Sequence, residues 1–201
     1  MARRLTASAV ERTIARFGET LTKAGLLAPA VASDDTRDLW PRRADPGRDL
    51  EVVGSLWGEY LTWVNGELGQ RYGVSFPIDE ILERNLADLT PFLPPRGRLL
   101  LVGDIGVGCL QPIGEDIGEI KRMYVKPDAR GAGVGRRLLE GLLEAAEEAG
   151  CHRVRLDSVR FMDAAHALYR GAGFVEIEPY EESEIPPEFW HLWVFMERVR
   201  P

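Results

Sequence analysis

In the first half of the chain, apolar residues recur at spacings of three and four, the period of an amphipathic helix. A weak pattern of this kind runs over residues 7–27, and a stronger one begins after Asp45–Asp49. The stronger pattern carries Leu50, Val53, Leu56, Trp57, Tyr60, Leu61 and Val64. A further helix is predicted over about residues 78–89, where three prolines then break the chain. A short first strand is predicted over residues 36–41.

From residue 98 onward, short apolar runs separated by turn residues predict a series of strands interrupted by two helices. The predicted strands cover residues 98–102, 107–112, 117–125, 152–156, 174–177 and 192–199, and the predicted helices cover 134–149 and 163–170. The order is helices first, then an antiparallel hairpin series, then alternating strands and helices. This order predicts a mixed α/β fold.

The segment from Met123 to Leu139 contains a strand, a glycine-rich loop and the start of a long helix. The first N–H groups of a helix have no internal partner, and the helix dipole adds partial positive charge there, so such a loop suits a pyrophosphate. The dinucleotide fingerprint needs a glycine where Arg136 stands, and no Gly-Lys-Ser/Thr of a P-loop occurs. A plain turn is the alternative, but the glycines precede the helix rather than end it.

Two motifs resemble the GNAT superfamily of acyl-CoA-dependent N-acetyltransferases. They are Arg130-x-x-Gly133-x-Gly135 and the Leu-Tyr-x-x-x-Gly-Phe pattern within Ala167–Phe174. The resemblance leaves residues 1–33 as an N-terminal extension with a weak helical pattern and makes residues 34–201 the acetyltransferase domain. It implies a twisted, mostly antiparallel sheet of six to seven strands with flanking helices, splayed between the fourth and fifth strands.

The resemblance also implies acetyl-CoA as co-substrate and no metal. The backbone amides of the glycine loop would hold the pyrophosphate, with Arg130 or Arg136 adding charge, and the exposed backbone at Met123 and Val125 would pair with the pantetheine arm. The implied coenzyme-binding residues are Met123, Val125, Arg130, Gly131, Gly133, Val134, Gly135 and Arg136. The alternative for Arg136 is a solvated helix face on which it pairs with Glu140.

Glu119 is the implied general base, because it stands eleven positions before Arg130, as does the base glutamate of the family's histone-modifying branch. Strand alternation predicts that Glu119, Lys121, Met123 and Val125 share one face. An amine with a pKa of about 10.4 is largely protonated at neutral pH, so its attack needs such a base. The neighbouring Lys121 would make the carboxylate a weaker base, and a surface Glu–Lys pair is the alternative.

Tyr169, in the second motif, is the implied general acid for the coenzyme thiolate; the alternative is a tyrosine packed in a helix. Family members often carry an asparagine where Met162 stands, so coenzyme contacts on this helix do not carry over. The segment 179–191 corresponds to loops that border the acceptor site in the family. Its acidic and aromatic residues would then meet a cationic acceptor, or would form a solvated loop: Tyr180, Glu181, Glu182 and Trp190.

Composition narrows the function classes further. A net charge of −7 argues against non-specific nucleic-acid binding. Cys109 and Cys151 lack metal-ligand spacing and suit reduced thiols. The chain shows neither a signal-peptide pattern nor an apolar run of the ~20 residues that a membrane span needs, so we expect a cytoplasmic protein without a membrane partner.

The predicted function is direct transfer of an acetyl group from acetyl-CoA to a primary amine of a small molecule, amino acid or peptide. No cysteine or serine stands at the expected acetyl position, which argues against a covalent enzyme intermediate. Two alternatives remain open: a non-catalytic acyl-CoA-binding module, and an acetyltransferase with a protein acceptor. Homodimers are common in the family, and the sequence does not decide between a monomer and a dimer.

Overall fold

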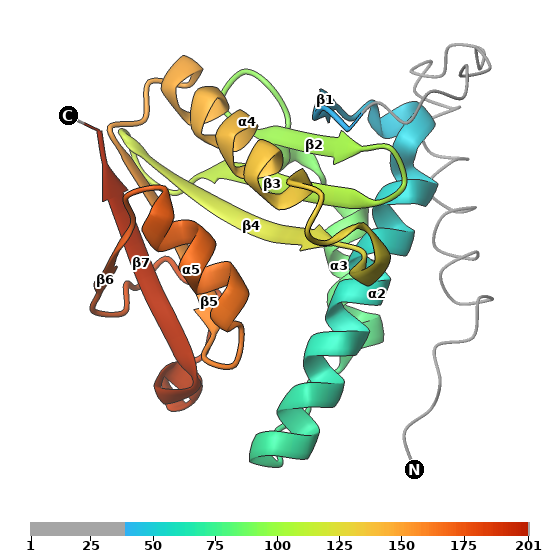
Figure 1. Ribbon diagram of the computed structural model, residues 1–201, viewed down its shortest axis with the longest axis vertical. Coiled ribbons are helices and arrows are strands. Elements are labelled where there is room, and N and C mark those ends of the chain that lie inside the picture. Colours follow the sequence, from blue (N-terminus) through green and yellow to red (C-terminus); the bar gives the residue numbers. More distant parts are fainter. Residues whose placement is uncertain (1–38, 201) are drawn as a thin grey trace.

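The computed structural model describes residues 39–200 (Figure 1). The extension predicted over residues 1–33 lies outside these residues. The strand predicted over 36–41 lies partly outside them, and its described residues 39–41 are not strand: the first strand is found at Arg42–Arg43 instead. Within them, every other predicted helix and strand is present, with bounds that differ by at most a few residues.

Helix α2 (Pro46–Tyr72) begins and ends as its sequence directs. The side chain of Asp45 caps it by accepting a hydrogen bond from the Gly47 N–H at 2.8 Å, and Pro46 occupies the first helical position. Gly73 ends it in the left-handed conformation, at φ 68°. The apolar face predicted from the spacing is the buried face. Helix α3 (Ile78–Ala87) packs beside it.

Seven strands form one sheet in the order β1-β2-β3-β4-β5-β7-β6 (Figure 1). They are β1 (Arg42–Arg43), β2 (Arg98–Val102), β3 (Gly106–Pro112), β4 (Ile117–Val125), β5 (Arg153–Val159), β6 (Val175–Ile177) and β7 (Trp193–Val199). All neighbouring pairs are antiparallel except β4 and β5, which run parallel.

Strands β4 and β5 separate soon after they meet. Their pairing covers only Ile117–Glu119 of β4, opposite Arg153–Arg155 of β5. Beyond Glu119, β4 keeps only β3 as a strand partner among the described residues, while β5 continues along β7. The predicted splay between the fourth and fifth strands is therefore confirmed.

Helices cover both faces of the sheet. Helices α4 (Val134–Glu148) and α5 (Asp163–Gly171) bury one apolar cluster, in front of the sheet in Figure 1, and α2 and α3 bury another. Helix α4 lies very close to β3, because a Cβ added to Gly108 would come within 2.8 Å of the Leu142 side chain. Near the start of α4, a Cβ added to Gly106 would likewise come within 3.1 Å of Val134 and Leu138.

The predicted alternation along β4 is wrong, because a β-bulge interrupts the strand. Arg122 has a positive φ of 53°, and the register with β3 shifts by one residue there. The extra residue moves Met123 to the α4 side, where it packs with Val125, while Glu119 keeps its contact with Lys121 on the opposite face. Glu119 therefore does not share a face with Met123 and Val125.

Candidate active site

The glycine loop leaves a row of backbone N–H groups without acceptors. Gly131 and Gly133 adopt φ of 82° and 81°, a region that residues with side chains avoid, and α4 starts directly afterwards. Within residues 39–200, no acceptor bonds the N–H groups of Val134, Gly135 or Arg136; the first N–H of α4 that finds one is that of Arg137, 3.1 Å from the Gly133 carbonyl. This arrangement can bind an anion.

The two arginines of the loop differ in placement. Arg130 turns back toward β4, where its Nε donates to the Val125 carbonyl at 3.1 Å and its guanidinium lies 5.2 Å from the centre of the Trp63 ring. Arg136 is exposed, and the alternative pair with Glu140 does not form. The Arg136 guanidinium is therefore free to reach an anion at the helix start.

The predicted pantetheine residues, Met123 and Val125, end β4 on its unpaired side of the splay. Both side chains pack against the α4 cluster, as expected of core residues. A Cβ added to Gly135 would come within 3.6 Å of Leu168 and 3.9 Å of Val125, so the helix start, the end of β4 and α5 meet at one place. The start of α4 and the end of β4, which carry predicted coenzyme residues, therefore lie next to each other.

Glu119 lies at the fork between β4 and β5 and is fully buried. Its Oε1 accepts a hydrogen bond from the Tyr180 hydroxyl at 2.8 Å, and its Oε2 accepts one from Gln111 Nε2 at 2.8 Å. Lys121 Nζ is 3.3 Å from the same Oε2. The surface-pair alternative is wrong, because these partners hold the carboxylate inside the molecule.

A second carboxylate, which the sequence reasoning missed, belongs to Asp157 on β5. It lies two residues beyond the last β4–β5 pair, and its side chain accepts a hydrogen bond from Ser183 Oγ at 3.0 Å. Burial raises the pKa of Asp157 to about 6, and the Glu119 and Glu184 carboxylates add to the rise while Lys121 opposes it. A carboxylate with this pKa is still mostly ionised at pH 7 and is a stronger base than an ordinary aspartate.

Tyr169 lies on α5, 6% exposed, with its ring tilted against Phe174. Its hydroxyl makes no hydrogen bond to another residue of the described part of the chain. Burial raises the pKa of Tyr169, and the nearby Tyr60 and Asp157 raise it further. The side chain therefore stays protonated at neutral pH, as a general acid must.

Of the predicted acceptor-loop residues, one is buried and one is partly buried, and both are held by hydrogen bonds. Tyr180 is buried and bonds Glu119, while Trp190 Nε1 donates to the Ile185 carbonyl at 2.8 Å. Glu182 lies 3.6 Å from Arg155, and Glu181 is exposed. The loop therefore supplies a buried partner for Glu119 and also carries exposed carboxylates at Glu181 and Glu182.

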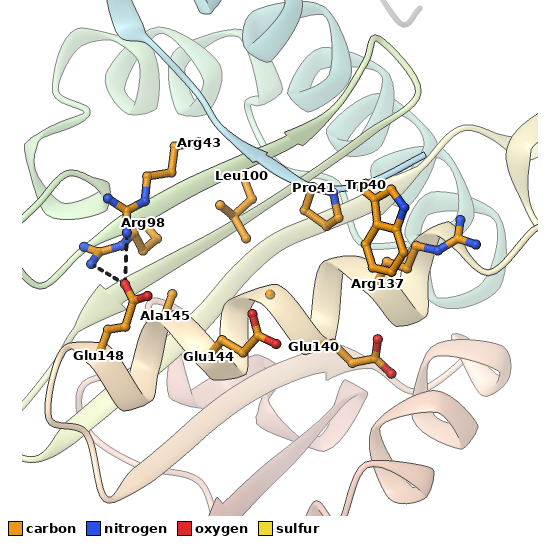
Figure 2. Close-up of a pocket in the computed structure, with 11 residues that line it drawn as sticks. Trp40, Pro41, Arg43, Arg98, Leu100, Arg137, Glu140, Glu144, Ala145 and Glu148 are labelled. Atoms are coloured by element: carbon orange, nitrogen blue, oxygen red, sulfur yellow. Dashed lines mark hydrogen bonds and ion pairs between the residues drawn. The ribbon is translucent and has the colours of Figure 1, made fainter. Parts of the chain in front are cut away.

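A cavity of about 240 Å³ lies elsewhere, between the β1–β2 edge and the outer side of α4 (Figure 2). Figure 2 shows Glu140, Glu144 and Glu148 in a line along α4, with Glu148 paired to Arg98. None of the predicted site residues lines this cavity. The fork and the glycine loop, rather than this cavity, form the candidate site.

Comparison with known proteins agrees with this geometry. The model of the acetyltransferase (GNAT) family matches residues 75–174. An IAA acetyltransferase of Azospirillum brasilense is 35% identical over 138 residues, covering 66% of this chain and 85% of the relative. An uncharacterized N-acetyltransferase of Schizosaccharomyces pombe is 28% identical over 145 residues, covering 69% and 84%. The chain therefore belongs to the GNAT family and is an acyltransferase.

Solved structures show the same fold. The PaiA N-acetyltransferase of Thermoplasma acidophilum, crystallised with coenzyme A, has a TM-score of 0.58 at 17% identity, covering 80% of this chain and 98% of that one. An acyl-CoA N-acyltransferase structure from Klebsiella pneumoniae has a TM-score of 0.58 at 24% identity, covering 79% and 95%. Within residues 39–200, no helix has the length and apolar character to cross a bilayer.

Proposed function

We propose that this enzyme transfers an acetyl group from acetyl-CoA directly to a primary amine of a small molecule, amino acid or short peptide. The observation that carries the proposal is the presence of three features along β4. These are the unbonded N–H groups at the start of α4, which follow the end of the strand, the unpaired side of β4, and the buried Glu119 carboxylate at the fork.

In this proposal the coenzyme pyrophosphate lies on the loop of Gly131, Gly133, Val134, Gly135 and Arg136, with the Arg136 side chain adding charge. The pantetheine arm extends along β4 at Met123 and Val125, where it occupies the place that a β5 partner would fill. Arg130 releases the Val125 carbonyl to the coenzyme and turns toward its phosphates.

The proton of the attacking ammonium passes to the carboxylates at the fork. Glu119 is the proposed base, and Asp157 shares the role because its carboxyl lies close enough to feel the Glu119 charge and its own pKa is raised. Tyr169 then protonates the departing thiolate. Cys109 takes no part as a nucleophile, because full burial raises the pKa of its thiol and keeps it neutral.

The proposed activity is tested by thiol release from acetyl-CoA across a panel of amines, with amine-free reactions as the control. The panel holds amino acids, polyamines, aminoglycosides and short peptides; curated relatives include an aminoglycoside N(6')-acetyltransferase of Stenotrophomonas maltophilia, 38% identical over 73 residues. We expect amine-dependent release that falls in Glu119→Gln and Tyr169→Phe. Release at the amine-free rate with every acceptor, from protein that binds acetyl-CoA, would contradict the proposal.

A further inference from the structure

Arg122 sits on the bulge of β4 and has an unusual environment for an arginine. Its backbone adopts the left-handed conformation, φ 53°, the only non-glycine residue to do so within residues 39–200. Its side chain is only 9% exposed, although the group is always charged. A strained backbone and a buried cation beside a candidate active site together indicate a role in recognition.

The donors of Arg122 are only partly used. Nη1 and Nη2 donate to the two oxygens of Glu184 at 2.5 and 3.1 Å, and Nη2 also reaches Asn85 Oδ1 on α3 at 3.3 Å. The amide of Asn85 is held in this orientation, because its Nδ2 donates to the Ile81 carbonyl at 2.7 Å. The buried Nε has no partner among the described residues. The guanidinium can thus donate one more hydrogen bond, to an acceptor from another molecule.

Glu184 is the replaceable member of this cluster. Its side chain is 37% exposed and comes from the loop between β6 and β7, whereas the side chains of Arg122 and Lys121 are 9% and 7% exposed. Burial alone would raise the pKa of Glu184, but Arg122 and Lys121 hold it at about 2, so the group is a carboxylate at every physiological pH. A carboxylate from another molecule would meet the same two cations, Arg122 and Lys121, and the same pair of guanidinium N–H donors.

Lys121 connects this cluster to the proposed base. Its Nζ lies 3.3 Å from Glu119 Oε2 and 3.3 Å from Glu184 Oε2. The Lys121 ammonium group therefore lies between Glu119, the proposed base, and Glu184, the carboxylate that Arg122 binds. An acceptor with an amine and a carboxylate a few bonds apart could place its amine at Glu119 and its carboxylate at Arg122.

We propose that Arg122, with Lys121 and Asn85, binds a carboxylate of the acceptor, and that Glu184 occupies this position until the acceptor displaces it. The inference rests on the proposed acetyl transfer and specifies its substrate class. The acceptor is an amino acid or a short peptide with a free carboxylate near its amine. Amines without an acidic group, such as polyamines, leave Arg122 paired with Glu184 and are poor substrates.

The test compares kcat/KM for amino acids and dipeptides supplied as free acids and as C-terminal amides. The wild-type enzyme should prefer the free acid by about 10²-fold, because the amide cannot form a charged bidentate pair with the guanidinium. In Arg122→Gln the ratio of kcat/KM for the free acid to kcat/KM for the amide should fall to within a few-fold of one. Amidation also changes the amine pKa, but that effect cancels when the acid-to-amide ratio is compared between enzymes.

Two further variants separate recognition from a merely structural ion pair. Glu184→Gln removes the competing carboxylate, so KM for the free acid should fall while KM for the amide stays the same. Arg170→Gln breaks an exposed ion pair with Glu176 on the far side of α5 and should leave the ratio unchanged. If Arg122→Gln does not fold, the change of KM in Glu184→Gln still decides whether Arg122 binds the acceptor carboxylate.

Equal use of acids and amides by the wild-type enzyme, or a ratio that is unchanged in Arg122→Gln, would overturn the inference and leave the acetyl transfer intact. An equal rise of KM for acids and amides in Glu184→Gln would likewise make the pair a structural link between the loop and β4. Thiol release that stays at the amine-free rate with every acceptor would instead overturn the proposed function, and this inference with it.

Discussion

Replacing Asp157 by asparagine should make the protein more stable at neutral pH and less active. The carboxyl has a pKa of about 6 in the folded protein, against an ordinary value of 3.8. A group whose pKa is raised by folding favours the folded state at low pH, and that contribution is lost as the pH rises through 6. At ~1.4 kcal/mol per pKa unit, the raised pKa of Asp157 lowers the free energy of unfolding by about 3 kcal/mol at pH 7.5 but only by about 1 kcal/mol at pH 4.5, where the carboxyl is protonated in the folded protein.

Asparagine keeps the shape and can still accept the hydrogen bond from Ser183, so the charge is the main change. Urea unfolding of the wild type and of Asp157→Asn at both pH values measures the difference. We expect the variant to gain about 2 kcal/mol more at pH 7.5 than at pH 4.5, while its turnover falls. An equal difference in unfolding free energy at the two pH values would show that the carboxylate is not destabilised by burial and would refute the reasoning.

Three other substitutions test the proposed roles separately. Glu119→Gln should lower turnover about 10²–10⁴-fold with little change in coenzyme affinity measured by calorimetry, and unchanged turnover across pH 6 to 9 would remove Glu119 from the mechanism. Tyr169→Phe should slow turnover without loss of thermal stability, because its hydroxyl bonds no described residue; an unaffected rate would assign it to the core alone. Gly133→Ala should weaken coenzyme binding through strain of about 1 kcal/mol at φ 81°, while Gly171→Ala, a glycine with equally open surroundings, should not.

The fold was largely predictable from local patterns. The period of apolar residues located α2 and α4, and the capping residue Asp45 and the terminator Gly73 explain where α2 begins and ends. These features depend on residues close in sequence, so they can be predicted from one amino-acid sequence. Element bounds shifted by a few residues where tertiary contacts decide, as at the end of α3.

The candidate site was only partly predictable, because its electrostatics depend on residues far apart in sequence. The glycine loop is a local motif, and Glu119 and Tyr169 followed from the resemblance. The bulge at Arg122 broke the alternation along β4, and its partner Glu184 is 62 positions away. Asp157 was missed because it follows the predicted strand 152–156 and, by alternation, falls on the same face as Arg153 and Arg155, so its position gave no local signal.

The transfer of the acetyl group itself is the central claim, and labelled acetyl-CoA tests it most directly. After incubation with amino acids and short peptides, products and protein are separated and the label is located. The account predicts label on the amine of the acceptor, none bound covalently to the protein, and a large loss of labelled product in Glu119→Gln. Label that stays on coenzyme A with every acceptor, or that accumulates on the protein, would contradict direct transfer.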